Sequence, residues 1–154
     1  MEKSIEKFLE ESLKSEKGIV KKRLLKWGAS LNMCDMKQEE ILKLKRLMEN
    51  GTKIYVNDNF ELLDKTVIDR YEKEINYIYE YIEGIMDEKR KMDLYISELE
   101  PTEQEFIYLK YRKGYDFNFV ANKMNVSRSQ VFRIKDFAID KLISIIKKYE
   151  NEIF

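Results

Sequence analysis

The sequence contains no histidine, one cysteine and one proline. Without histidine the chain lacks the commonest general base and the commonest metal ligand, which excludes Ser-His and Cys-His nucleophilic catalysis. Cys34 alone excludes an intramolecular disulfide and a thiolate metal cluster. There is also no glycine-rich phosphate-binding loop. These absences argue against an enzyme and predict neither a metal nor a cofactor.

Long apolar runs are missing as well. No segment approaches the roughly 18 apolar residues of a membrane span, and the N-terminus lacks the apolar core of a signal peptide. We therefore expect no membrane partner and a reducing, cytoplasmic location. Only five glycines and one proline occur among 154 residues, of which 44% are hydrophobic and 38% charged. This composition predicts an all-α fold.

The charge is balanced overall but unevenly distributed. The chain has 29 basic and 29 acidic residues, of which the last 54 residues hold ten basic and seven acidic ones. The C-terminal third therefore carries a net charge of +3 and the remainder −3. This mild asymmetry is compatible with nucleic-acid contact at the C-terminal end.

Short amphipathic helices are expected in the first half of the chain. The pattern predicts helices over 4–17, 19–33 and 36–49, interrupted at Gly18 and near 32–35. Asn50-Gly51 resembles a helix C-terminus, so 51–59 is expected to be a loop. The apolar residues that define the second and third helices are Leu24, Leu25, Trp27, Leu31, Ile41, Leu44, Leu47 and Met48.

A long helix with a heptad pattern follows over 60–99. Its apolar positions step alternately by three and four residues, which is the spacing of a coiled coil. Lys89 is the only charged residue of this seam, and its stem is expected to pack while its ammonium group reaches water. The seam consists of Ile68, Tyr71, Ile75, Ile78, Ile82, Ile85, Lys89, Met92, Ile96 and Leu99.

The apolar seam must be buried against another helix, and the sequence allows two partners. Helix 36–49 could fold back as an antiparallel hairpin, or a second copy of the chain could form a homodimer through 60–99. The seam is roughly 46 Å long and helix 36–49 only roughly 21 Å, at ~1.5 Å per residue. Because the shorter helix is unable to cover the whole seam, self-association is favoured. Helices within 4–33 could instead pack on the remainder of the seam.

A domain boundary is expected near Pro101, which divides the chain into a helical, coiled-coil-like arm (1–99) and a C-terminal domain (100–154). The residue before proline is biased away from helix. Thr102 and Glu105 have the spacing of a capping box. The next helix is expected to extend to Lys113, with Phe106 and Leu109 facing inward, and to end at Gly114.

Residues 117–136 have the pattern of a helix-turn-helix. Ala121 is small where two helices would cross, and Asn125 tolerates the positive φ that such a turn needs. Ser127 is a good N-cap for the second helix. Further positions at helical spacing are expected to face inward: Val120, Met124, Val126, Val131, Ile134, Ala138, Leu142, Ile145 and Ile146.

Residues 99–142 resemble region 4 of sigma-70 factors. That family shows a Leu-x-Pro-x-Glu start, an apolar run ending Leu-Arg-Tyr, a Gly-ended turn, an Ile-Ala pair, a Val-Ser-x-x-x-Val-x-x-Ile stretch and a terminal Ala-x-x-Lys-Leu. The matching positions are Glu103, Leu109, Tyr111, Gly114, Val120, Ala121, Val126, Ser127, Val131, Ile134, Ala138, Lys141 and Leu142.

The resemblance implies that the second helix enters the major groove of double-stranded DNA. It places Arg128, Ser129, Gln130, Phe132 and Arg133 at or beside the bases. Arginine can bind guanine and glutamine can bind adenine in a bidentate manner. Family members often carry an acidic residue where Ser129 stands, so the usual −35 sequence is not expected. The expected phosphate contacts are Lys110, Arg112, Lys113, Lys123 and Lys135.

The first 100 residues contain no counterpart of sigma region 2. A helical arm before a region-4-like domain is similar to phage and prophage late-gene regulators of the ArpU/RinA type, which implies a bacterial, nucleoid-associated transcription regulator. Alternatives are a module that binds RNA polymerase or a sigma factor, of the anti-sigma or appropriator type, and a terminase small subunit. Phe132 is the only exposed apolar residue expected on the DNA-facing surface, which favours DNA over protein as its ligand.

Overall fold

The computed structural model describes residues 4–7, 15–55 and 61–151, and every regular element in these ranges is helical. The all-α prediction is therefore confirmed for this part of the chain. Within the same ranges, no helix combines the length and the apolar character needed to cross a membrane. The chain forms two compact units. Residues 1–29 with 88–154 form what we call the core unit, and residues 30–87 form the hairpin unit.

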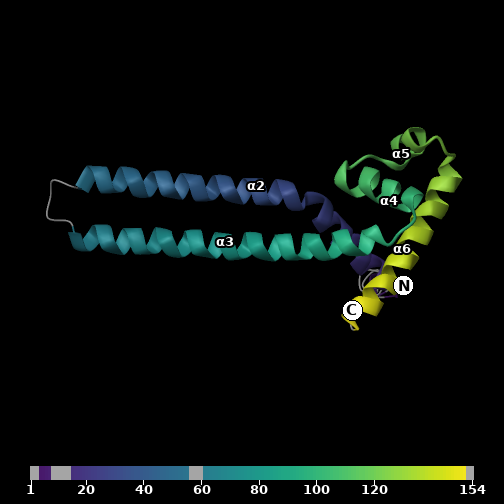
Figure 1. Ribbon diagram of the computed structural model, residues 1–154, viewed down its shortest axis with the longest axis horizontal. Helices are drawn as coiled ribbons and strands as arrows, with labels where there is room; N and C mark the ends of the chain where they lie inside the picture. The colour runs from purple at the N-terminus through teal and green to yellow at the C-terminus, as the bar shows by residue number, and fades with distance from the viewer. Residues whose placement is uncertain (1–3, 8–14, 56–60, 152–154) are drawn as a thin grey trace. The chain divides into compact units, whose positions relative to one another are not determined.

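Helix α2 runs without interruption from Glu16 to Tyr55 (Figure 1). The interruptions expected at Gly18, near 32–35 and at Asn50-Gly51 are therefore wrong. Asparagine and aspartate cost only about 0.7 kcal/mol each inside a helix, and packing along one face outweighs such costs. Parts of the expected first helix (8–14) and of the expected loop (56–60) lie outside the described residues.

One face of α2 is buried or half-buried from Val20 to Met48, and it is not the face with the most leucines. Leu25, Leu31 and Leu47 are 61%, 46% and 51% exposed. Several positions of the buried face hold small or polar residues, so hydrophobic periodicity alone identifies it poorly. The buried and half-buried positions step by three and four residues: Val20, Leu24, Trp27, Ser30, Cys34, Lys37, Ile41, Leu44 and Met48.

Helix α3 extends from Glu61 to Ser97, close to the expected 60–99. All ten residues expected in its seam are buried or half-buried. The Lys89 side chain is 22% exposed, and its ammonium group lies 2.8 Å from a carboxylate oxygen of Asp93. Lys89 therefore packs its stem in the seam and pairs its charge at the edge.

Within the hairpin unit, α2 lies antiparallel to α3 (Figure 1). The Lys37 ammonium nitrogen is 5.2 Å from the ring centre of Tyr81, whereas that of Lys45, later in α2, is 5.9 Å from the ring of Tyr79, earlier in α3. The length argument for a dimer no longer applies, because α2 has 40 residues and α3 has 37.

The helix that begins at Pro101 changes from α-helical to π-helical geometry in its last turn. Helix α4 covers Pro101–Ile107 and is followed by the π-helical segment η1, Tyr108–Arg112. The amide of Lys113 donates to the carbonyl of Tyr108 at 3.0 Å, five residues back. Helical winding therefore extends to Arg112, with Lys113 as its C-cap and Gly114 next at φ +73°, so the helix ends where it was expected to end, although its last turn is π-helical.

The expected capping box at this helix start is also displaced. A Glu103 carboxylate oxygen accepts the amide of Glu100 at 3.1 Å, so the box is formed by Glu100 and Glu103 instead of Thr102 and Glu105. Pro101 occupies the first turn, where its missing amide proton is not needed.

Helices α5 (Phe117–Met124) and α6 (Arg128–Glu150) complete the core unit. Both α4 and α5 pack against α6. One hydrophobic cluster joins these helices to the start of α2 and the end of α3, including Val20, Met92 and Leu99. Residues on both sides of the boundary expected at 99/100 thus share a single core.

Candidate functional site

The chain between α4 and α6 is held by local capping contacts. A carboxylate oxygen of Asp116 accepts the amide of Phe119 at 2.8 Å and caps α5. Asn125 has φ 55° and ψ 44°, the left-handed conformation that was expected. The Ser127 hydroxyl accepts the amide of Gln130 at 3.2 Å, and the Gln130 side-chain oxygen accepts the amide of Ser127 at 2.9 Å. The predictions for Asn125 and Ser127 are confirmed.

The inner faces of α5 and α6 meet in the core. Val120 and Val131 are fully buried, and Ala121 is 6% exposed. A small side chain at 121 allows the two helices to approach closely. These contacts fix which side of α6 turns outward.

The residues expected to face DNA bases lie mostly on this outer side. Arg128, Ser129 and Arg133 are exposed. Ser129 and Arg133 are four residues apart and so share one helix face, one turn apart. Phe132 is half-buried, and its ring centre is 4.7 Å from that of Phe117. Phe132 is therefore part of the packing between the helices.

Gln130 is exposed, but its side chain is already engaged. Its oxygen accepts the Ser127 amide in the cap. A bidentate contact with adenine would need that same oxygen together with the amide nitrogen. Within the capped helix, Gln130 would have to share its oxygen between the cap and the base, or leave the cap, to make that contact.

Acidic side chains limit the outer face of α6. Asp136 and Asp140 lie three and seven residues after Arg133, and their side chains are 63% and 60% exposed. At these spacings they share the face of Arg133. Asp136 pairs with Lys135 at 3.7 Å and Asp140 pairs with Lys17 at 3.8 Å, but two exposed carboxylates still make this part of α6 less suited to a polyanion than its first two turns.

The lysines expected to contact phosphate differ in exposure. Lys113 and Lys123 are exposed, and their ammonium nitrogens lie 5.6 Å from the ring centre of Tyr108 and 5.5 Å from that of Phe119. Lys110 and Lys135 are half-buried, with their ammonium nitrogens 4.7 and 5.7 Å from the ring centre of Phe117. Cations held over an aromatic face are partly ordered before any ligand binds.

Arg112 makes a packing contact instead. Its guanidinium carbon lies 4.3 Å above the Trp27 ring. The Trp27 indole nitrogen donates to Asp93 at 2.8 Å. Arg112 thus helps to join η1 to α2 and α3, and the sequence pattern carried no sign of this partner.

The apolar surface differs from the expectation for Phe132. Phe119 is 43% exposed and Phe137 is 63% exposed, whereas Phe132 is half-buried. The expectation that Phe132 is the only exposed apolar residue here is therefore wrong. Phe137 lies one turn beyond Arg133, among the charged residues of α6.

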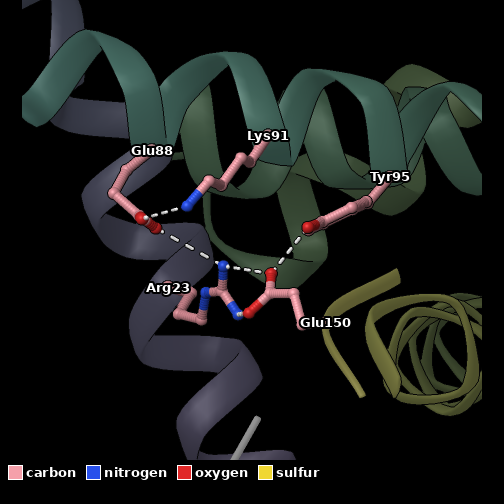
Figure 2. A network of polar contacts seen from close by, with 5 residues as sticks. All are labelled: Arg23, Glu88, Lys91, Tyr95 and Glu150. Carbon is pink, nitrogen blue, oxygen red and sulfur yellow. Dashed lines mark hydrogen bonds and ion pairs between the residues drawn. The ribbon is translucent and has the colours of Figure 1, made fainter. Parts of the chain in front are cut away.

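A polar network that the sequence did not reveal holds the far end of α6 (Figure 2). The Arg23 guanidinium donates to both carboxylate oxygens of Glu150, at 3.2 and 2.9 Å. The Tyr95 hydroxyl donates to Glu150 at 2.6 Å. Glu88 lies 3.4 Å from both Arg23 and Lys91. Side chains from α2, α3 and α6 are thereby joined.

The network changes the acidity of its members. Burial raises the pKa of Tyr95 to about 12, aided by its hydrogen bond to Glu150. Burial alone would raise the pKa of Glu150, but hydrogen bonds from Arg23 and Tyr95 outweigh it and lower the pKa below the ordinary 4.5. The folded protein therefore favours an ionised Glu150 and a protonated Tyr95.

Replacing Glu150 with glutamine should reduce stability at neutral pH and make it less sensitive to acid. A lowered folded pKa stabilises the fold above about pH 4.5, and this contribution is lost as pH falls through the folded pKa. We expect Glu150→Gln to cost about 1–3 kcal/mol at pH 7 and less at a pH well below 4.5, where the carboxyl of the folded protein becomes protonated. Urea unfolding followed by circular dichroism would measure both values. An equal difference at the two pH values would contradict the prediction.

The residues that carry the resemblance to sigma-70 region 4 occupy packing and capping positions in the core unit. Val120, Val131 and Leu142 are fully buried, and Ser127 caps α6. Many compact helical domains would require such residues at these places, so the resemblance stays a prediction. Comparison of the chain with protein-family models, curated proteins and solved structures gave no significant match.

Proposed function

We propose that the protein is a sequence-specific DNA-binding transcription regulator, in which α5 and α6 act as a helix-turn-helix and α6 enters the major groove. One observation carries this proposal. The first two turns of α6 present Arg128, Ser129 and Arg133 on the exposed side, while Val131 anchors the opposite side in the core. Rigid presentation of arginines by a helix is how many proteins read guanine.

The electrostatics of the helix start support the same assignment. The amino end of a helix carries a partial positive charge and attracts phosphate. Lys113 and Lys123 are exposed cations within the core unit that can contact the phosphate backbone of DNA. Asp136 and Asp140 confine the favourable region to the amino-terminal part of α6. The proposed reading segment is accordingly 128–133.

The wider biological assignment is a phage-type activator in a bacterial cytoplasm, associated with the nucleoid. It rests on the sigma region 4 pattern over residues 99–142 and on the helical arm that precedes it. In this proposal residues 100–154 bind DNA, and the coiled-coil-like arm of 1–99 binds a partner such as RNA polymerase.

A second candidate function is a module that binds RNA polymerase or a sigma factor. It is favoured by Phe119 and Phe137, which expose large apolar surfaces in the core unit. Aromatic side chains are enriched at the centres of protein interfaces. A terminase small subunit is less well supported, because its DNA-binding part usually precedes its oligomerising helices.

Selection of bound sequences from randomised duplex DNA would test DNA recognition. We expect wild type to enrich a motif and the Arg128→Ala/Arg133→Ala double variant to enrich none. Each lost bidentate contact removes about 1–3 kcal/mol of base discrimination. Both arginines are exposed, so thermal unfolding of the double variant should match wild type.

Lys113→Ala is the matched control for non-specific charge. It should enrich the same motif as wild type but bind all sequences more weakly, with a salt slope smaller by about 1. Absence of any motif with wild type at moderate salt would overturn the proposal and favour the protein-binding module. Retention of the motif by the double variant would show that α6 is not the reading helix.

A further inference from the structure

The hairpin unit has little hydrophobic core of its own. Among its described residues, the buried hydrophobic ones are Cys34, Ile41 and Ile75. Two packed helices bury only one stripe each, and stable bundles normally add further helices. Large exposed hydrophobic side chains are numerous along both helices of this unit: Leu31, Met36, Leu42, Leu47, Val67, Tyr77, Tyr79 and Tyr81.

Some of these side chains border a groove of about 470 Å³ between α2 and α3. Its apolar wall consists of Leu44, Leu47, Tyr77 and Ile78. Leu47 is 51% exposed and Tyr77 is 69% exposed, the largest exposed fraction among the large hydrophobic side chains that the structure describes in this unit. A tyrosine and a leucine beside a groove provide the kind of anchor that protein interfaces use.

The charges at the groove are self-complementary. Lys37 and Glu40 lie 3.4 Å apart and are paired within the chain. Lys43 on α2 and Glu74 on α3 also line the groove, and neither has an ion-pair partner among the described residues. When one unpaired basic residue and one unpaired acidic residue lie on the same surface, a two-fold axis can place each opposite the other type on a second copy, which gives two ion pairs.

We propose that this groove is the interface through which two copies of the chain associate, with Lys43 of each copy opposite Glu74 of the other. Leu47 and Tyr77 of one copy then fill the groove of the second, and the two hairpins form a four-helix bundle. The inference concerns the hairpin unit and does not depend on DNA binding.

The size of the surface suits such a dimer. The described helical segments of the hairpin unit, 30–55 and 61–87, are roughly 39 and 40 Å long at ~1.5 Å per residue. Two adjacent helices, each ~10 Å across, offer a face with a projected area of roughly 790 Å². A standard stable interface buries about 800 Å² on each partner. The hairpin is therefore long enough for a dimer without help from the core unit.

Charge reversal and mixing would test the proposal without DNA. Sedimentation velocity over a concentration series should show a dimer for wild type at micromolar concentrations. Lys43→Glu and Glu74→Lys should each weaken dimerisation by about tenfold or more, because like charges then face each other twice. An equimolar mixture of the two variants should recover the wild-type affinity, since each reversed charge meets its opposite on the other copy.

Recovery in the mixture distinguishes contact between copies from contact within one chain, because an intrachain pair stays broken in both components. Leu47→Glu should also abolish the dimer, whereas Leu42→Glu should retain it. Leu42 is 53% exposed, closely matching Leu47, but does not line the groove. Circular dichroism should confirm that all variants remain helical.

Three results would overturn the proposal: a wild-type monomer at tens of micromolar, a mixture no tighter than its components, or equal effects of the two leucine substitutions. A monomer that still selects a DNA motif would reject the interface and leave the DNA-binding proposal intact. A dimer that selects no DNA motif would support the interface and reject the DNA-binding proposal.

Discussion

A Gly28→Ala variant is expected to be severely destabilised, by about 3 kcal/mol or more. A Cβ atom at Gly28 would lie 1.9 Å from the carbonyl oxygen of Tyr111 and 2.6 Å from its carbonyl carbon. The obstructing atoms are backbone, so a change of side-chain rotamer is unable to relieve the clash. Separating α2 from η1 would also disturb the stacking of Arg112 on Trp27.

Gly84→Ala is the matched control for this substitution. Gly84 also lies in a long helix, α3, but a Cβ atom there meets nothing within 4 Å. Alanine should therefore stabilise α3 by about 0.5–1 kcal/mol through its better helix propensity. Urea unfolding of both variants would measure the difference. Similar effects of the two substitutions would show that Gly28 is not in close contact with η1.

A Phe106→Ala variant is expected to lose about 3–5 kcal/mol of stability. Phe106 is fully buried, and its ring centre lies 6.4 Å from that of Phe117 in a stacked arrangement. Truncation removes the largest fully buried side chain of the core and leaves a cavity between the helices that support α6. The cost therefore includes both the lost burial and the cavity.

Phe137→Ala is the control for Phe106→Ala. Phe137 is 63% exposed on α6, so its loss should change stability by no more than about 0.5 kcal/mol. Chemical denaturation followed by circular dichroism would compare the two. A large loss of stability for Phe137→Ala would mean that this ring is covered in solution by the chain itself or by a second copy of it.

The local features of the candidate site could be predicted well from sequence. Asn125 has the expected left-handed conformation, and Ser127 caps α6 as expected. Both depend on the chemistry of a residue and its nearest neighbours. The exposure of Arg128 and Arg133 followed from the same helical spacing that buries Val131.

Side-chain engagement within the site was not predictable in the same way. Gln130 completes a cap, Arg112 stacks on Trp27, and Phe132 packs on Phe117. A long or aromatic side chain can reach several neighbouring groups, and the folded structure determines which of them it contacts. Helical spacing indicates the face a residue occupies but not which neighbour it contacts.

The sequence alone determined the all-α composition, the seam of α3 and the α5–α6 turn, because these follow from helix propensity, regular spacing and capping over a few residues. Only the tertiary structure decided that α2 is continuous, that Gly28 lies against η1, and that Arg23 pairs with Glu150, 127 residues away. Such contacts depend on which distant surfaces meet. Packing against those surfaces keeps a helix continuous across residues that have poor helix propensity. Such packing produces no regular hydrophobic spacing that could be recognised in the sequence.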